Sequence, residues 1–177
     1  MDGLNIIPQQ EGAAEYPRFG KLATFYVGRF LFQHLVATDL LAEPKLSPEL
    51  RNEALYYRAK AYVKQKADKK AMDDFRELAK DTRNPYGAEA KYLVAQSLYD
   101  AKEYAAAEKE LLNYIEQSTP HAYWLARSFV LLSDVYAATG KDLDARQYLL
   151  SLQQNYQGND DIESMIESRL AKLKGAN

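Results

Sequence analysis

One spacing of small residues constrains the fold more than any other feature of the chain: two small side chains stand twelve positions apart, and the pair occurs three times. The three pairs are Ala59 with Ala71, Ala95 with Ala107, and Ser133 with Ala145. Both members repeat at intervals of 36 and then 38 residues. Self-similarity at a period of about 20 to 50 residues is typical of a solenoid, whose units each pack on their neighbours. The spacing therefore predicts an array of similar units in this chain of 177 residues.

Large residues keep the same register as the small ones. Three positions after the first small residue of each pair stand Tyr62, Leu98 and Tyr136, and four positions after the second stand Phe75, Leu111 and Leu149. Residues three and four apart share one face of a helix. A small side chain lets a partner helix approach closely, and a large neighbour fills the space beside it. We therefore expect hairpins of two helices that touch at the small residues.

Helix boundaries are marked in the sequence at both ends of these hairpins. A capping side chain followed by proline is typical of the first turn of a helix, and it occurs at Ser47 with Pro48, Asn84 with Pro85, and Thr119 with Pro120. Turns are expected at 66–68, 102–103 and 140–142. Since no sustained alternation of apolar and polar residues indicates a strand, the expected fold class is all-α.

The pattern of a small residue, a large one three later, alanine nine later and a large residue four further on resembles the tetratricopeptide repeat. The segment 131–152 matches best, with Leu132, Ser133, Tyr136, Gly140, Ala145 and Leu149 on the family's positions. Arg58 and Lys91 depart from it, because the family usually has leucine and tryptophan there. The resemblance implies a right-handed α-α superhelix of about three to four helical hairpins with a C-terminal capping helix.

The resemblance also implies a division of the chain. The expected parts are a flexible arm at 1–15 and a single helical domain at 16–177, made of a degenerate hairpin at 16–44, repeats at 48–83, 84–119 and 120–157, and a capping helix at 160–174. One face of the capping helix carries Ile162, Met165, Ile166, Arg169 and Leu173 at helical spacing, and charged residues lie opposite this largely apolar stripe.

A narrower resemblance is to tetratricopeptide proteins of Gram-negative, Bacteroidetes-type bacteria. It implies a periplasmic or outer-membrane-associated location, with the cytoplasm as the alternative. The N-terminal sequence shows no basic stretch followed by an apolar core, so it predicts no secretory signal.

The stretch from 22 to 41 is apolar on both faces of the expected helix. Arg29 and Asp39 interrupt it, so we expect a buried helix and no insertion into a membrane. Three covers are open for its second face: residues 1–15, a second copy of the chain in a homodimer, or upstream repeats of a longer array. The residues expected at a self-association surface are Leu22, Phe25, Tyr26, Phe30 and Leu31.

Patterns that indicate catalysis or metal binding are few. The chain has no cysteine, and its two histidines, His34 and His121, belong to no catalytic or metal-binding motif. A net charge of -2 and a pI near 5.8 do not favour nucleic-acid binding. We therefore predict a protein that is not an enzyme, with no cofactor, no metal and no nucleic acid; an enzyme with an acidic pocket and an RNA-binding helical repeat are the alternatives.

Two pairs of adjacent aspartates are interpreted as solvated faces and helix caps, Asp73 with Asp74 and Asp160 with Asp161.

In the tetratricopeptide family the first helices of successive hairpins line a groove that holds a partner peptide. The groove positions carried over to this sequence are Glu53, Tyr56, Lys60, Lys64, Glu89, Tyr92, Gln96, Tyr99, Asp100, Arg127 and Asp134. The family's carboxylate clamp is not matched, and Trp124 is expected to bury the junction between the second and third hairpins. The resemblance implies a non-catalytic scaffold that binds another protein or peptide; the alternative is a structural module of a longer array, or a homodimer that packs through 22–41.

Overall fold

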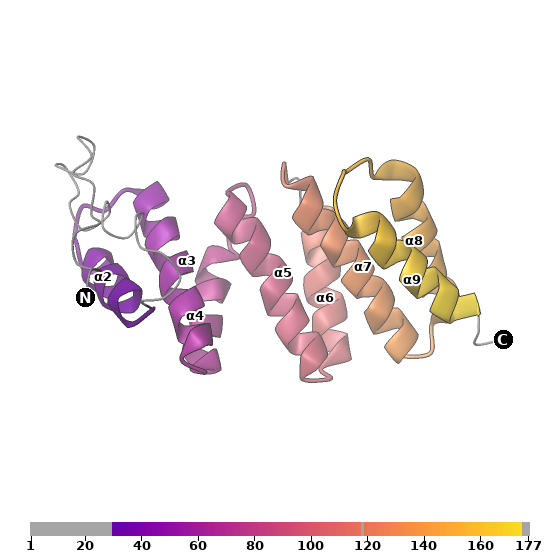
Figure 1. Ribbon diagram of the computed structural model, residues 1–177, viewed down its shortest axis with the longest axis horizontal. Helices are drawn as coiled ribbons and strands as arrows, with labels where there is room; N and C mark the ends of the chain where they lie inside the picture. The colour runs from indigo at the N-terminus through magenta and orange to yellow at the C-terminus, as the bar shows by residue number, and fades with distance from the viewer. Residues whose placement is uncertain (1–29, 118, 175–177) are drawn as a thin grey trace, which may run out of the picture. The chain divides into compact units, whose positions relative to one another are not determined.

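The computed structural model describes residues 30–117 and 119–174, apart from the side chains of 30–35 and 174 (Figure 1). Within these ranges the chain is helical and has no strand, so the prediction of an all-α protein is confirmed. The helices are α2 (Phe30–Leu41), α3 (Pro48–Lys64), α4 (Asp68–Leu78), α5 (Pro85–Asp100), α6 (Tyr104–Glu116), α7 (Ala122–Ala138), α8 (Asp142–Asn155) and α9 (Ile162–Lys174). The arm expected at 1–15 and residues 16–29 of the hairpin expected at 16–44 lie outside the described residues.

Two of the three predicted helix starts are confirmed. The Ser47 hydroxyl accepts a hydrogen bond from the Leu50 amide at 3.3 Å, and the Asn84 side chain accepts one from the Gly87 amide at 2.8 Å. In both helices proline occupies the first turn, where its missing N–H leaves no bond unmade.

The start predicted at Pro120 is wrong, because α7 begins two residues later, at Ala122. The Thr119 hydroxyl accepts from the His121 amide at 3.2 Å and donates to the carbonyl of Thr82 at 2.9 Å. The His121 ring adds a contact of 2.9 Å between Nε2 and the carbonyl of Arg83. Thr119 and His121 thus tie this loop to the loop before α5, and Thr119 does not cap the helix.

The three hairpin turns share one backbone conformation, at the positions that the repeat predicted. Two residues after the end of each first helix stands a residue of positive φ, with angles of 58° at Lys66, 59° at Lys102 and 75° at Gly140. The next amide donates to the carbonyl five residues earlier: Ala67 to Tyr62 at 2.9 Å, Glu103 to Leu98 at 2.9 Å, and Lys141 to Tyr136 at 2.8 Å. This is the Schellman arrangement of a helix C-terminus. The repeat is therefore present in the backbone as well as in the side chains.

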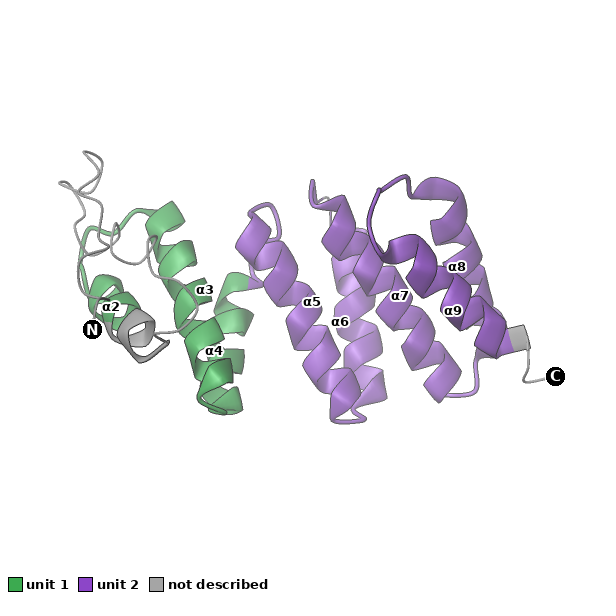
Figure 2. Ribbon diagram, in the orientation of Figure 1, with its two compact units in different colours: residues 1–78 green, residues 79–177 purple. Residues whose placement is uncertain are grey.

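The chain divides into two units, 1–78 and 79–177 (Figure 2). In the first unit α3 packs against both α2 and α4. Val36, Ala37 and Leu40 of α2 are buried with Ala54 of α3 in one apolar cluster. The described end of α2 therefore uses an apolar face for packing within its own chain.

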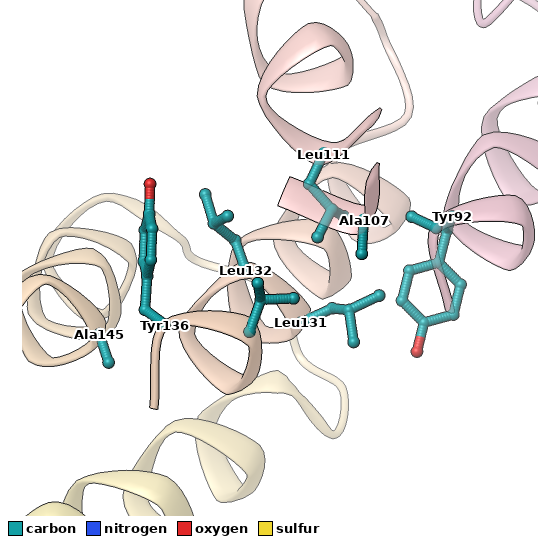
Figure 3. Close-up of a cluster of buried hydrophobic side chains, with 9 residues drawn as sticks. Tyr92, Ala107, Leu111, Leu131, Leu132, Tyr136 and Ala145 are labelled. Carbon is teal, nitrogen blue, oxygen red and sulfur yellow. The ribbon is translucent and has the colours of Figure 1, made fainter. Parts of the chain in front are cut away.

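In the second unit the helices form two layers. Helices α5, α7 and α9 run side by side in one layer, and α6 and α8 cover the other side (Figure 1). Helix α6 packs on α5 and α7, and α8 packs on α7 and α9. Apolar side chains from successive hairpins meet between the layers, as Figure 3 shows for Tyr92, Ala107, Leu131 and Tyr136.

The six small residues of the repeat are buried, as their spacing predicted. Their exposed fractions are 0% for Ala59, Ala71, Ala107 and Ala145, 1% for Ala95 and 2% for Ser133. Leu111 and Leu149, four residues after the second small residue, are also 0% exposed. The structure therefore confirms that these residues are contact points.

The two departures from the repeat pattern are explained by ion pairs between the helices of a hairpin. Arg58 of α3 holds Asp74 of α4 through Nε to Oδ2 at 2.8 Å and Nη2 to Oδ1 at 2.6 Å. Lys91 Nζ of α5 lies 2.8 Å from both Glu110 Oε1 and Asn113 Oδ1 of α6. The interpretation of Asp74 as part of a solvated face is wrong, because this side chain is buried against Arg58.

The last helix closes the core of the second unit. Ile162 and Ile166 of α9 are 0% and 1% exposed, and they share a cluster with Val130 of α7 and Leu149 of α8. Asp160 caps the helix by accepting from the Ile162 amide at 3.0 Å, which confirms the cap interpretation for this aspartate.

Candidate partner-binding face

The predicted groove residues lie on the first helix of each hairpin. Four are on α3 in the first unit: Glu53, Tyr56, Lys60 and Lys64. The Tyr56 ring meets the Tyr57 ring edge to face at 5.7 Å, and Lys60 Nζ lies 5.1 Å from the Tyr56 ring centre. Burial raises the pKa of the Glu53 carboxyl above its ordinary value. In this unit the structure brings Tyr56 and Lys60 together.

Along α5 the predicted residues form a chain of hydrogen bonds. The Tyr92 hydroxyl donates to Gln96 Oε1 at 2.9 Å, and Gln96 Nε2 donates to Asp100 Oδ1 at 2.9 Å. The three stand four residues apart, so they lie on one face of the helix. Tyr92 is 8% exposed and belongs to the apolar cluster of Figure 3. The Tyr92 ring therefore packs in the core, and its hydroxyl takes part in the row of hydrogen bonds along α5.

Arg127 of α7 connects the hydrogen-bonded residues of α5 to the neighbouring segments. Its Nη2 donates to the Tyr92 hydroxyl at 3.2 Å, its Nη1 donates to the Tyr123 hydroxyl at 2.9 Å, and Nη1 lies 3.5 Å from Asp161 Oδ2 just before α9. Burial lowers its pKa, but the contacts with Tyr92 and Tyr123 more than offset this, so the net pKa is raised and the guanidinium stays charged.

The Arg127 guanidinium also rests among aromatic rings. Its carbon lies 4.9 Å from the ring centre of Tyr92, 5.7 Å from that of Tyr123 and 5.9 Å from that of Trp124. These distances are within the range of cation–π attraction. The Trp124 ring packs 5.6 Å from Tyr92, between the second and third hairpins, as the sequence predicted.

Asp134 of α7 is held by a residue that the sequence interpretation did not include in the site. Arg169 of α9 donates to it from Nε at 2.8 Å and from Nη2 at 2.8 Å, a two-bond arrangement that fixes both side chains. Tyr99 of α5 lies near this pair, and burial first, then the charge of Asp134, raises the pKa of its hydroxyl. The Tyr99 ring packs 5.6 Å from that of Tyr104.

The second unit therefore brings together six of its predicted residues on α5 and α7. They are Tyr92, Gln96, Tyr99, Asp100, Arg127 and Asp134. Glu89 lies on the same helix α5 and is half-buried. Sequence reasoning missed Tyr123, Asp161 and Arg169 as members of this face. One signal could have found Arg169: it is a charged residue inside the apolar stripe of α9, which indicates a buried partner.

Three of the five residues of the predicted self-association surface lie outside the described part of the chain. Leu22, Phe25 and Tyr26 lie outside the described residues, and Phe30 and Leu31 belong to α2 without described side chains. Self-association through 22–41 therefore stays a prediction.

The face is built of aromatic rings and charges that are paired with one another. Such a surface offers contact area, hydrogen-bond partners and fixed charges to a second molecule. In the described part of the chain no three histidine, aspartate or glutamate side chains gather in a way that could hold a metal ion. Nor does any helix of that part have the length and apolar character needed to cross a membrane.

Comparison with known proteins returned no match: no protein-family model, no curated protein sequence and no solved structure is significantly similar to the chain.

Proposed function

We propose that the chain is a tetratricopeptide-like, non-catalytic scaffold that binds another protein or a peptide through the face formed by α5, α7 and α9. The observation that carries the proposal is the network around Arg127 of α7, which contacts Tyr92 of α5 at 3.2 Å and Asp161, just before α9, at 3.5 Å. A face whose side chains are already fixed loses little conformational entropy when a partner binds.

The repeat supports the tetratricopeptide-like part of the proposal. The same turn recurs at Lys66, Lys102 and Gly140, and the small residues that the family places between its helices are buried. In that family the first helices carry the binding surface, and the network lies on first helices here. An envelope assembly of a Gram-negative bacterium is the setting that the narrower resemblance suggests.

Site-specific photo-crosslinking tests the proposal. A benzophenone amino acid replaces Asp100, an exposed residue of the face, or Lys109, an exposed residue of α6 in the other layer. We expect crosslinking to a partner in the source cell extract from position 100 and not from position 109. Equal labelling at both positions, or labelling from position 109 alone, would overturn the assignment of the face.

A second arm measures the affinity for the partner so identified. Tyr92→Phe keeps the buried ring and removes the hydroxyl that joins Gln96 to Arg127, so it alters the network without opening the core. We expect it to weaken binding by about three- to tenfold, the effect of losing one or two surface hydrogen bonds. Unchanged affinity would show that the network takes no part in recognition.

A further inference from the structure

A groove lies between α8 and α9, apart from the face described above. Its volume is about 350 Å³, and its lining residues are Arg146, Leu150, Gln153, Glu167, Leu170 and Ala171. Leu150 is 36% exposed, and Leu143, on the same stripe of α8, is 79% exposed. An exposed apolar stripe beside a hollow is a common feature of sites that bind a helix.

The lining residues correspond to positions 38 residues earlier, where the repeat places α6 and α7. Leu170 and Ala171 of α9 correspond to Leu132 and Ser133 of α7, and the burial of Ile166 matches that of Ser128. Arg146 and Leu150 of α8 correspond to Glu108 and Leu112 of α6. The groove is therefore the α8 and α9 copy of the surface between α6 and α7.

One repeat earlier, α8 packs on the α7 side of that surface, and Lys141 just before α8 reaches α6. Leu132 shares a buried cluster with Ala145, and the Phe129 ring packs 6.0 Å from the Tyr148 ring. Lys141, immediately before α8, places Nζ 3.2 Å from Glu108 Oε2. Leu132 and Ser133 are buried there, whereas their counterparts Leu170 and Ala171 are half-buried and exposed, respectively. In the described part of the chain no helix covers the groove between α8 and α9 in this way.

We propose that this groove binds an amphipathic helix of a second protein, seated as α8 is seated one repeat earlier. The second helix of each hairpin in this chain shows which residues such a partner helix needs at the contact. Each has alanine followed four residues later by a large apolar residue: Ala71 and Phe75, Ala107 and Leu111, Ala145 and Leu149. Alanine permits close approach to Ala171, and the large residue fills the space beside Leu170.

The charge at the edge of the groove specifies a third feature of the partner helix. Lys141, four residues before Ala145, contacts Glu108. The position of Glu108 is taken by Arg146 in the groove, so the sign of the charge is reversed. The partner helix therefore has aspartate or glutamate, then alanine four residues later, then leucine or phenylalanine after four more. This inference does not depend on the proposed function, since the two surfaces lie on different residues.

Peptides cut from the chain itself supply the probe. A fluorescent peptide of residues 140–156 contains Lys141, Ala145 and Leu149, and a hydrocarbon staple between positions 147 and 151, both exposed on α8, keeps it helical. Its Lys141→Glu form places an acid opposite Arg146. We expect the full-length protein to bind the Glu form about two- to fivefold more tightly than the unchanged peptide at low salt, the range of one exposed ion pair. Equal affinity, or tighter binding of the unchanged peptide, would overturn the charge assignment.

Two further comparisons test whether the peptide helix packs against Ala171 in the groove. A peptide with Ala145→Leu should lose at least about tenfold in affinity, because a larger side chain prevents close approach. In the protein, Ala171→Arg should abolish binding, and Ser168→Arg, an equal change at an exposed position outside the lining, should leave it intact. Failure of every peptide to bind, or binding that survives Ala171→Arg, would overturn the proposal. A dimer seen by light scattering and abolished by Ala171→Arg would overturn the choice of a second protein and assign the groove to a second copy.

Discussion

At the scale of single residues, the hairpin turns show how one backbone requirement is met by different side chains. Lys66, Lys102 and Gly140 stand at the same position of the same turn, with φ between 58° and 75°. Glycine adopts this conformation freely, whereas a residue with a Cβ is strained there by about 1 kcal/mol. Two of the three turns therefore hold a strain that the third does not.

This difference predicts opposite effects of exchanging the residues. Lys102→Gly should raise the free energy of unfolding by up to about 1 kcal/mol, because it removes the strain. Gly140→Ala should lower it by about 1 kcal/mol through backbone strain alone, since a Cβ at this glycine meets no atom within 4 Å. Chemical denaturation of the two variants measures both values. A loss of stability on Lys102→Gly would show that the lysine is not strained in the folded protein.

The small residues at the helix contacts predict a second pair of outcomes. Ala107 is 0% exposed, and the adjacent Ala106 on the same helix is exposed. Ala107→Leu should destabilise the protein by about 1 to 3 kcal/mol, because the larger side chain forces α6 away from α5. Ala106→Leu should change stability by less than about 0.5 kcal/mol. Similar unfolding midpoints for the two variants would contradict the role given to the repeat's alanines.

Tyr156 predicts a loss of stability in alkali. Burial, followed by its hydrogen bond to Asp160, raises the pKa of the Tyr156 hydroxyl from its ordinary value of 10.0 to about 12. A raised pKa in the folded state means that the neutral form is favoured on folding. This contribution is complete below about pH 10 and disappears as the pH rises through about 12.

The variant Tyr156→Phe isolates this contribution. It should lower stability at about pH 8 through the lost hydrogen bond, yet lose less stability than the wild-type protein between about pH 9 and pH 12. Urea denaturation across this range gives the two slopes, and parallel slopes would exclude Tyr156 as a source of the pH dependence.

At the scale of helices, the pair of Asp134 and Arg169 fastens α9 to α7. The side chains are 24% and 29% exposed and share two hydrogen bonds of 2.8 Å. Asp81 and Arg83 form a similar two-bond pair within one loop, but Arg83 is 80% exposed. Solvent weakens an ion pair as its exposure increases. The first pair should therefore contribute more to stability than the second.

Double-mutant cycles test this comparison. Asp134→Asn with Arg169→Gln should give a coupling energy of about 1 kcal/mol, whereas Asp81→Asn with Arg83→Gln should give less than about 0.5 kcal/mol. Equal couplings would show that burial between α7 and α9 does not strengthen the pair. The single variants should be checked by circular dichroism, so that a loss of α9 is not mistaken for a loss of the ion pair.

Helix-scale features divide into those that the sequence can predict and those that it cannot. The spacing of apolar residues predicts which individual side chains are buried, so Ala107 and Leu111 could be identified as contacts from the sequence alone. Asp74 could not, because its partner Arg58 is 16 residues away on another helix and an ion pair has no local pattern. Tyr92 could be placed on the candidate face from its position in the repeat. The contact between its hydroxyl and Arg127 could not be predicted, because the two residues lie on different helices.

At the scale of the whole molecule, the division at residues 78 and 79 gives each part its own core. The second unit holds two buried clusters, one around Leu132 and Ala107 and one around Leu149 and Ile162. Its helices α5 to α9 pack on one another in every neighbouring pair. A unit with a separate core can fold independently of the rest of its chain.

We therefore expect a fragment of residues 79–177 to fold without residues 1–78. Trp124 is the single tryptophan of the chain and lies in this unit, so its fluorescence reports the unfolding of the second unit in both the fragment and the full-length protein. The thermal midpoints measured at Trp124 should agree within about 5 °C, which corresponds to roughly 1 kcal/mol for a domain of this size. Circular dichroism of the fragment should show a helical protein that unfolds cooperatively. A fragment without cooperative unfolding, or with a much lower midpoint, would show that the second unit depends on the first for its stability.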